Sequence, residues 1–573
     1  MKNKVDAIFL ILMCGIFLIV ANIYNFKTEK FSAPDEFSHF EYIRFLNNNH
    51  HFPALTNKTS FWEAHQPPLY YLFLSPIDLV LKNKILIDSE IKILRFFSSL
   101  LGVLTVIFAF LTAKLLFNPP SSCLRFGYGR QACGTTADKE RIIYYSLTLA
   151  FCFWPMFLFI SGVLNNDVLA NLLGVMMLYF VVKHNTNIRI YANDTNMRIG
   201  ELRFFNLDLF VCGVIAGLAF LTKLTLYPFA MLFLIIIFWK NRNNWKDYLK
   251  FTLSPALIVC FAWMFRNLIF VGDIFGLKFA NKFWEGQHRD LWNFNNFVTW
   301  LNELFKNFLG VFGQANIGFD PKYYDYFLYF LILVAILLPV SLFLIWKKQK
   351  DKFNIVLIIF LFFIVAFLTT FYYSLDNYQP QGRYLLPALF SAMLMFVLAI
   401  NIIFAGKLKF IMPVLILIIL AFLNKNAFLH IDWTNEHKPL ISNDEKYNLI
   451  SKKWIAKNSK WKNKNKNYVL KINKKDAFLR SDPNLRLDTN VVKCLKLKLK
   501  NTEFKKLKVE FRYLGDKDFL SSNSVIKKIH KDGKFHAYEF DFDLRKNDLV
   551  QIIRLDFVGS KKGSVEFKKI MIE

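Results

Sequence analysis

The chain has 573 residues, of which 54% are hydrophobic and 65 are phenylalanine, and this is more apolar side chain than a soluble protein of that size can bury. Apolar runs such as 8–24, 328–346, 355–372 and 385–404 are each long enough to cross a hydrocarbon core of about 30 Å as a helix. These properties exclude a cytosolic enzyme, a secreted disulfide scaffold and a disordered tail protein. They indicate a polytopic membrane protein. The formal net charge of +29 then reflects either basic residues that set the membrane topology or a surface that binds an anionic partner.

Apolar segments along the first three quarters of the chain predict eleven membrane-spanning helices. They cover residues 5–25, 92–116, 142–160, 163–182, 206–222, 225–239, 251–270, 325–346, 353–373, 384–405 and 410–424. With the N-terminus inside, the inner connecting segments hold most of the Lys and Arg, and the short outer turns hold little more than Lys223 and Arg383. Because Lys and Arg favour the cytoplasmic side, we expect this orientation in the cytoplasmic (inner) membrane. The odd number of spans then puts the C-terminus and two long loops, 26–91 and 271–324, outside.

The composition changes after residue 425, where the long apolar runs stop. Segments such as 468–472, 494–499 and 507–513 alternate apolar and polar residues, which predicts half-buried strands. We therefore expect an extracytoplasmic β-sandwich (jelly-roll-like) over residues 433–573, following an α-helical transmembrane domain over residues 1–425. From residue 424 onward there are 35 Lys and Arg against 19 Asp and Glu. This tail thus carries +16, which would lie along anionic head groups or wall polymer.

The segment directly after the first predicted span is the most informative part of the sequence. Residues 32–42 read Ser-Ala-Pro-Asp-Glu-Phe-Ser-His-Phe-Glu-Tyr. Pro34 suits a first helical turn, and on such a helix Asp35 and His39 share one face. Two adjacent carboxylates, Asp35 and Glu36, beside a histidine at the mouth of a helical bundle form a candidate site. The alternative is that both acids only complement the positive end of the helix dipole.

Three further polar motifs fall on the same predicted side of the membrane. Residues 63–71 read Glu-Ala-His-Gln-Pro-Pro-Leu-Tyr-Tyr, which could equally start an interfacial helix with aromatic anchors. Residues 165–167 read Asn-Asn-Asp, where Asp167 is either a helix cap or a second acid facing a cavity. Residues 379–387 read Gln-Pro-Gln-Gly-Arg-Tyr-Leu-Leu-Pro. There Arg383, like Lys223, either binds an anion such as a lipid phosphate or snorkels to head groups.

Taken in this order, the four motifs resemble the GT-C superfamily of integral-membrane glycosyltransferases, which use polyprenyl-phosphate sugars. The likeness is greatest to bacterial relatives of protein mannosyltransferases and lipid A aminoarabinose transferases, and it covers residues 1–425. The end of the tail, residues 553–567, is similar to jelly-roll domains that some bacterial members carry. The sequence contains no Trp-Trp-Asp signature of oligosaccharyltransferases, and this disfavours transfer of whole glycans to asparagine.

The resemblance implies a role for each candidate residue. Asp35 matches the catalytic aspartate and would deprotonate the acceptor, and Glu36 would orient it or hold a cation. Arg383, together with Lys223, would neutralise the departing polyprenyl phosphate. The other residues expected around the substrate are His39, His65, Gln66, Tyr70, Asp167 and Tyr384. Superfamily members vary in their need for a metal, and Glu36, His39 or His65 would be the ligands of a divalent ion in this chain.

The predicted function is therefore that of an inverting, GT-C type glycosyltransferase. It would transfer a sugar from a polyprenyl-phosphate carrier to a lipid-linked glycan, a cell-wall polymer or a protein outside the membrane, with no nucleic acid as partner. The alternative from another class is a transporter or flippase of lipid-linked glycans. Such proteins usually show internal repeats and polar residues at mid-membrane. This sequence has no evident repeat, and its charges lie at the outer ends of the predicted spans.

Overall fold

The computed structural model describes residues 2–53, 62–117, 130–191, 199–276, 289–404, 406–429 and, with short gaps, 447–573. The chain divides into two compact units. The helical unit contains residues 1–39, 63–70 and 94–433, and the mixed unit contains residues 40–62, 71–93 and 434–573. Helices α2 (Glu36–Asn49), α3 (Leu69–Leu81) and α4 (Ile87–Phe117) each contribute residues to both units.

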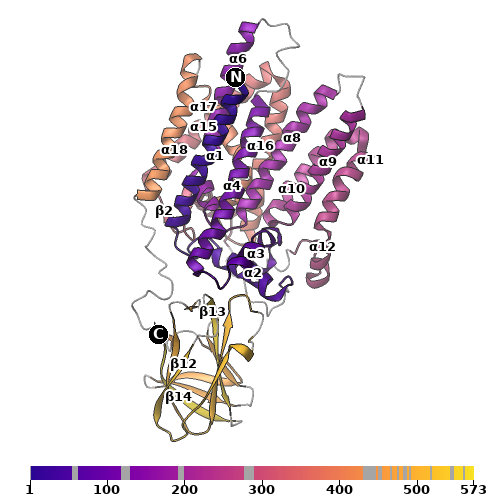
Figure 1. Ribbon diagram of the computed structural model, residues 1–573. Coiled ribbons are helices and arrows are strands. Elements are labelled where there is room, and N and C mark those ends of the chain that lie inside the picture. Colours follow the sequence, from indigo (N-terminus) through magenta and orange to yellow (C-terminus); the bar gives the residue numbers. More distant parts are fainter. Residues whose placement is uncertain are drawn as a thin grey trace. The chain divides into compact units, whose positions relative to one another are not determined.

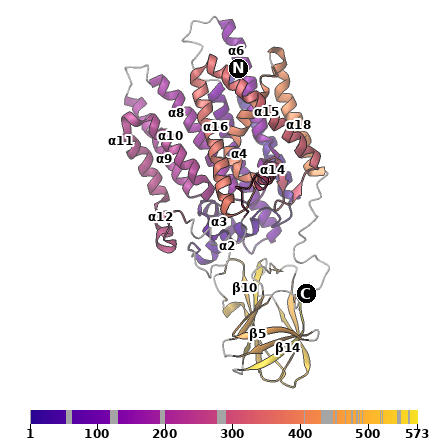
Figure 2. The same cartoon turned by 180° about the vertical axis from the view of Figure 1, so that it is seen from behind.

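Long apolar helices build the helical unit, and they run side by side in Figure 1 and, from behind, in Figure 2. The helices up to the middle of the chain are α1 (Lys2–Lys27), α2 (Glu36–Asn49), α3 (Leu69–Leu81), α4 (Ile87–Phe117), α6 (Arg130–Cys152), α7 (Pro155–Ser161), α8 (Asp167–Tyr191), α9 (Ile199–Phe220), α10 (Tyr227–Lys240), α11 (Trp245–Tyr248) and α12 (Ser254–Val271). They are followed by α14 (Phe294–Gly310), the short strands β1 (Val311–Phe312) and β2 (Ile317–Gly318), α15 (Pro321–Lys348), α16 (Lys350–Asp376), α17 (Leu389–Ile400) and α18 (Ile411–Leu429). Short turns of helix also occur, including η1 (Trp62–His65), η2 (Leu224–Leu226), η3 (Arg242–Asn244), η4 (Leu249–Leu253), η5 (Gly382–Ala388) and η6 (Gly406–Phe410).

Among the described residues, eight helices are long and apolar enough to cross a membrane. A ninth span results if α6 and α7, which are bent by 56° at a break, form one crossing. This number differs from the eleven predicted spans because the apolar helices at Asn206–Phe220 and Leu224–Lys240 are shorter than 18 residues. The α6–α7 break coincides with Pro155, which cannot donate a helical hydrogen bond and occupies the first turn of α7. The chain is a multi-pass membrane protein.

Close backbone contacts hold α8 against the segment before α17. A Cβ atom on Gly174 would lie 2.5 Å from the carbonyl oxygen of Pro387, so only glycine fits there. This contact turns one face of α8 toward η5, the turn of helix that carries Arg383. The packing of α8 on η5 therefore determines where Arg383 lies.

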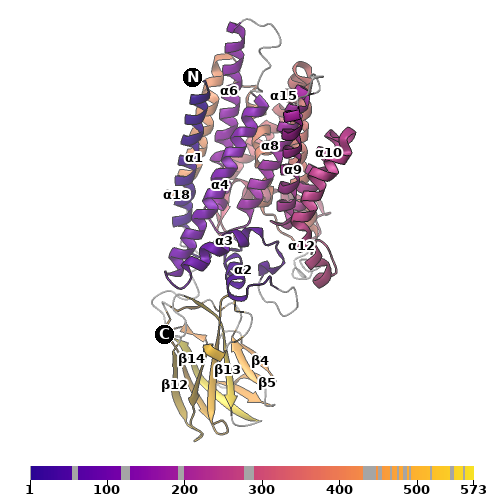
Figure 3. The ribbon, with the colours of Figure 1, turned by 45° about the vertical axis from the view of Figure 1, so that its right-hand side comes forward.

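Two antiparallel sheets of six strands each form most of the mixed unit (Figure 3). One has the order β11-β10-β13-β7-β4, with β8 also paired to β13, and the other has the order β12-β9-β14-β6-β5, with β3 also paired to β14. The strands are β3 (Tyr447–Asn448), β4 (Trp454–Lys457), β5 (Ser459–Lys464), β6 (Asn467–Ile472), β7 (Phe478–Ser481), β8 (Leu487–Asp488), β9 (Cys494–Asn501), β10 (Lys506–Tyr513), β11 (Ser524–Lys528), β12 (Phe535–Asp541), β13 (Leu549–Val558) and β14 (Gly563–Ile572); the short helix η8 (Ser521–Asn523) precedes β11.

The alternating sequence pattern explains these strands, because one apolar set faces a common core. Leu497 of β9 and Ile570 of β14 are paired neighbours, and both are buried with Leu507 and Leu555 of the other sheet. The prediction of a helical membrane protein with a C-terminal region of antiparallel strands is confirmed.

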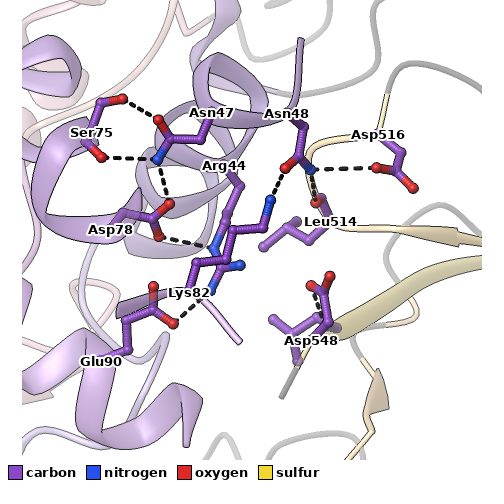
Figure 4. Close-up of polar contacts among 11 residues, drawn as sticks. Arg44, Asn47, Asn48, Ser75, Asp78, Lys82, Glu90, Leu514, Asp516 and Asp548 are labelled. Carbon is purple, nitrogen blue, oxygen red and sulfur yellow. Dashed lines mark hydrogen bonds and ion pairs between the residues drawn. The ribbon is translucent and has the colours of Figure 1, made fainter. Parts of the chain in front are cut away.

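The mixed unit also contains a buried polar cluster, in which α2 meets α3, the start of α4 and the turn after β10 (Figure 4). The Arg44 guanidinium lies 2.9 Å from Asp78 Oδ1 and 2.5 Å from Glu90 Oε2. Asn49 Nδ2 donates to the Gly515 carbonyl at 2.7 Å. Gly515 has a φ of +81°, and a Cβ there would lie 2.7 Å from the Arg44 backbone. This glycine therefore permits the close approach of the turn to α2.

Candidate active site

The first acid of the predicted motif lies in the turn just before α2. Asp35 has a φ of +58°, a left-handed conformation that is uncommon outside glycine and is best tolerated by Asn and Asp. Its carbonyl accepts a hydrogen bond from the His39 amide at 3.0 Å, so the turn leads directly into the helix. The side chain remains 30% exposed. Asp35 is thus held at the helix entry with its carboxylate accessible.

Four charged side chains from distant segments, one of them Asp35, are linked by successive contacts. Asp35 Oδ2 accepts a hydrogen bond from Arg383 Nη2 at 2.5 Å. Arg383 Nη1 lies 3.7 Å from Oδ2 of Asp167, the first residue of α8. The other oxygen of Asp167 accepts from Lys223 Nζ at 2.6 Å. Asp35, Arg383, Asp167 and Lys223 therefore form a continuous chain of alternating charge, which we call the charge chain.

Residues 379–384 support the two cations of the charge chain. Gln381 Oε1 accepts from Arg383 Nε at 2.5 Å, and Gln379 Oε1 accepts from the Tyr384 hydroxyl at 2.9 Å. The Tyr384 ring lies 5.2 Å from Lys223 Nζ and 5.3 Å from the Arg383 guanidinium carbon. These contacts are within cation–π range. Tyr384 therefore supports both cations rather than presenting its hydroxyl to the charge chain.

Asp35, His39 and Glu63 form a second grouping beside the charge chain. Among the described residues, they are the only set of three or more His, Cys, Asp and Glu side chains whose ligand atoms gather, within 4.8 Å of one another. His39 and Glu63 are buried. Two carboxyl oxygens and one imidazole nitrogen are a donor set that suits a divalent transition metal such as Mn²⁺ or Zn²⁺. These three residues fit a divalent cation.

The surroundings of Asp35, His39 and Glu63 shift their pKa values in different directions. Burial opposes ionisation of Asp35, but the charges around it, of which the Arg383 guanidinium is the first and Lys223 a weaker one, together outweigh burial and lower the pKa of Asp35 from its usual value. Burial lowers the pKa of His39 to about 3, against the attraction of Asp35. Burial, reinforced by the negative charge of Asp35, raises the pKa of Glu63 to about 8. Near neutral pH, Asp35 is therefore ionised, His39 is neutral and Glu63 carries a proton.

The second acid of the motif, Glu36, has different surroundings. Its carboxylate is fully buried and accepts from Arg95 Nε at 2.7 Å and Arg95 Nη2 at 2.6 Å. It also accepts from the backbone amides of Phe31 at 2.8 Å and Leu164 at 3.1 Å. Four hydrogen bonds fill its acceptor positions. The Glu36 carboxylate is thus committed to Arg95 and two backbone amides, which leaves it no free acceptor position for a cation; its expected orienting role stays a prediction.

The other predicted residues lie around this centre in supporting positions. The Tyr70 hydroxyl is hydrogen-bonded to Ser98 Oγ at 2.8 Å, and the Tyr70 ring meets the His39 ring edge-on with centroids 6.4 Å apart. His65 Nε2 and Gln66 Nε2 are 3.1 Å apart. His65 is outside the grouping that fits a cation, so of the three predicted metal ligands only His39 belongs to it.

Several residues of the site were not predicted. Glu63 belongs to the quoted motif at 63–71, and its place two residues before His65 was the available signal. Arg95 lies near the start of a predicted span, where snorkelling is the usual interpretation of an arginine. Gln381, the partner of Arg383, and Gln379, the partner of Tyr384, both precede Arg383 within four residues, so the polar composition of that motif could have indicated them.

The comparisons with known proteins concern the fold. No family model and no curated protein matches the sequence. Among solved structures, the chain is similar to ArnT from Cupriavidus metallidurans in the apo state, with 13% identity, a TM-score of 0.42 and coverage of 68% of this chain and 59% of that one. ArnT bound to undecaprenyl phosphate gives 13% identity, a TM-score of 0.41 and coverage of 68% and 60%.

A second likeness is to the archaeal oligosaccharyltransferase AglB from Archaeoglobus fulgidus, in complex with an inhibitory peptide and a dolichol-phosphate. It has 13% identity, a TM-score of 0.43 and coverage of 74% of this chain and 55% of that one. The chain thus spans less than two thirds of the length of these proteins. At 13% identity and TM-scores of 0.41 to 0.43, the likeness to these structures is distant and concerns the fold alone.

Proposed function

We propose that the chain is an inverting glycosyltransferase that transfers a sugar from a polyprenyl-phosphate carrier to a hydroxyl acceptor on the extracytoplasmic side of the membrane. The observation that carries the proposal is the charge chain. In it an accessible carboxylate, Asp35, is paired with one buried cation, Arg383, and a second buried cation, Lys223, follows through Asp167. Sugar transfer from a phosphate carrier needs a base for the acceptor and positive charge for the leaving phosphate. The charge chain supplies both within a few ångströms.

In the reaction, the Asp35 carboxylate takes the proton of the acceptor hydroxyl. The acceptor oxygen forms a bond to the anomeric carbon of the sugar while the bond from that carbon to the phosphate oxygen breaks. The phosphate leaves with the electron pair, and Arg383 and Lys223 balance its charge. Inversion follows because the acceptor enters opposite the leaving phosphate.

The ion pair between Asp35 and Arg383 has a consequence for the order of events. A guanidinium binds phosphate through two donors, and Arg383 Nη1 makes no hydrogen bond to any described residue. A carrier phosphate on Arg383 competes with Asp35 for the guanidinium. We therefore infer that donor binding releases Asp35 to act on the acceptor.

A divalent cation, where required, would be held by Asp35, His39 and Glu63 and would supply a Lewis acid for the acceptor or phosphate oxygen. Glu36 and Arg95 would set the direction in which Asp35 is presented. The acceptor classes expected from the sequence are a lipid-linked glycan, a wall polymer or a protein. The basic two-sheet region, on the outside in the expected topology, would face the same compartment.

The test uses the full chain purified in detergent, with a radiolabelled polyprenyl-phosphate sugar and a panel of hydroxyl acceptors. We expect transfer, or slow hydrolysis of the donor without acceptor, by the wild type and by Asp208→Asn, and loss of both with Asp35→Asn. Asp208 is a suitable control because it pairs with Lys183 outside the charge chain. Comparable turnover by Asp35→Asn would show that another residue is the base. Movement of a lipid-linked sugar across liposomes by the wild type, without transfer or hydrolysis, would favour a transporter.

A further inference from the structure

Two buried asparagines at the start of α8 have no role in the reaction described above. Asn166 and Asn171 are both 0% exposed. Neither the oxygen nor the nitrogen of either side-chain amide has a hydrogen-bond partner among the described residues. Because buried polar groups are nearly always hydrogen-bonded in native proteins, four such atoms on one helix require an explanation.

Neighbouring asparagines show that α8 does not in general leave buried side-chain amides without hydrogen bonds. Asn165 donates to the Pro34 carbonyl at 3.0 Å and accepts from the Asp167 amide at 2.9 Å, so it caps the helix. Asn185, further along α8, donates to the Val181 carbonyl at 2.7 Å. Asn166 is therefore not needed as a cap, and a buried asparagine on α8 can satisfy its amide from the helix itself.

Both asparagines lie close in sequence to Asp167 of the charge chain. Asn166 precedes Asp167, and Asn171 lies four residues after it, on the same face of α8. Gly174, three residues further along that face, is the residue that packs against Pro387 of η5. The face of α8 that carries Asn171 is thus the one turned toward the segment of Arg383.

A side-chain amide suits a different ligand group from the one that Lys223 and Arg383 suit. Phosphate oxygens only accept hydrogen bonds from protein donors, and Lys223 and Arg383 offer donors alone. An asparagine offers one acceptor and two donors, so a phosphate would leave its oxygen unpaired. A sugar hydroxyl both donates and accepts, and it can satisfy both ends of the amide. Two neutral amides within four residues of Asp167, which pairs with both cations, therefore match a ligand with hydroxyl groups next to a phosphate.

We propose that Asn166 and Asn171 form a hydroxyl-binding subsite for the sugar ring of the carrier-linked donor. The inference rests on the proposed function and deepens it by assigning the part of the donor that is recognised. A site built to hydrogen-bond hydroxyls discriminates strongly against a ligand that lacks them, because its buried polar groups are then left unpaired. The two asparagines accordingly distinguish a sugar-bearing carrier from the bare carrier.

The experiment measures binding to the full chain in detergent by native mass spectrometry, with undecaprenyl phosphate and with undecaprenyl phosphate carrying glucose or mannose. For Asn171→Leu we expect at least tenfold weaker binding of whichever sugar-bearing carrier the wild type binds best, and unchanged binding of the bare carrier. Thermal unfolding provides a second readout. Because leucine of similar size removes an unpaired buried amide, we expect the Tm of Asn171→Leu to stay the same or rise.

The matched control is Asn185→Leu, a buried asparagine on the same helix whose amide already has a partner. Its binding of both carriers should equal that of the wild type. Asn171→Ser, which keeps a hydroxyl, should retain part of the preference for the sugar-bearing carrier. Asn166→Ala, like Asn171→Leu, should reduce the preference for the sugar-bearing carrier over the bare carrier.

Several outcomes would overturn the inference while leaving the proposed function intact. If Asn171→Leu weakens both carriers equally, the residue contacts the phosphate or supports the fold. If it lowers the Tm and leaves the sugar preference in place, its role is structural. If wild type and all variants bind both carriers alike, no hydroxyl subsite exists at this position. A wild type that binds neither carrier would instead contradict the proposed function, and the subsite with it.

Discussion

Asp35 and Glu36 are adjacent carboxylates in the sequence, but they occupy two different kinds of polar region. Glu36 is fully buried and accepts four hydrogen bonds. Asp35 is partly exposed and is held mainly by one guanidinium. A carboxylate whose acceptor positions are all filled can position its neighbours but cannot readily take a proton. Of these two adjacent residues, Glu36 therefore has a structural role and Asp35 is the one available for proton transfer.

The two arginines that face these acids differ in the same way. Arg95 uses all of its donors, two on Glu36 and the others on the carbonyls of Asn25, Thr28 and Glu29. Arg383 donates to Gln381 and Asp35, while its Nη1 makes no hydrogen bond to a described residue. Arg95 therefore has no donor left for a ligand, and it links the end of α1 to α2 through Glu36; we call Arg95 and Glu36 with these partners the closed region. Arg383 keeps a donor for a ligand.

Removing the base should have the largest effect. We expect Asp35→Asn to lower kcat for sugar transfer by about 10²–10⁴-fold, the usual contribution of a positioned general base. The melting temperature should change little because the amide still accepts from Arg383. Turnover is followed by release of radiolabel from the donor. Activity within threefold of the wild type would remove Asp35 from the chemistry and with it the contrast to Glu36.

Removing the cation from the closed region should act on stability instead. Arg95→Leu leaves Glu36 buried and unpaired, so we expect a loss of about 3–5 kcal/mol in the free energy of unfolding. Thermal or denaturant unfolding of the purified chain in detergent measures it. The control is Lys183→Leu, which breaks the half-buried pair with Asp208 and should cost about 1 kcal/mol or less. Equal losses in the two variants would contradict the structural role of Arg95.

Metal binding gives a third way to compare the acids. We expect Glu63→Gln to weaken Mn²⁺ binding by roughly 10–100-fold, the scale on which residues around a metal site affect affinity. Glu36→Gln should leave Mn²⁺ affinity unchanged because its carboxylate is already committed to Arg95. Isothermal titration calorimetry on metal-stripped protein provides the measurement. The reverse pattern, with Glu36→Gln the weaker binder, would place Glu36 in the cation site.

The sequence predicted the general fold and the main motifs because both depend on local patterns. Apolar runs indicate spanning helices and alternation indicates strands, whatever the rest of the chain does. The partnerships inside the site depend on packing between distant segments. Residue spacing cannot show that Arg95 pairs with Glu36 and Arg383 with Asp35, since the partners are 59 and 348 residues apart in sequence. Nor does it show that the amides of Asn166 and Asn171 are buried with no hydrogen-bond partner among the described residues, as this depends on how α8 faces η5.

A conservative change at Arg95 gives the smallest and most specific effect. Lysine keeps the positive charge but replaces five donors in a planar fork with three on a flexible stem. Arg95→Lys should therefore cost about 1–1.5 kcal/mol of unfolding free energy, on the order of one net hydrogen bond, much less than Arg95→Leu. If the role of Arg95 is positional, kcat should fall modestly and KM for the donor should stay unchanged, because the carrier phosphate binds at Arg383. A rise in KM with unchanged stability would instead mean that Arg95 contacts the donor, and the closed region would then be part of the binding site.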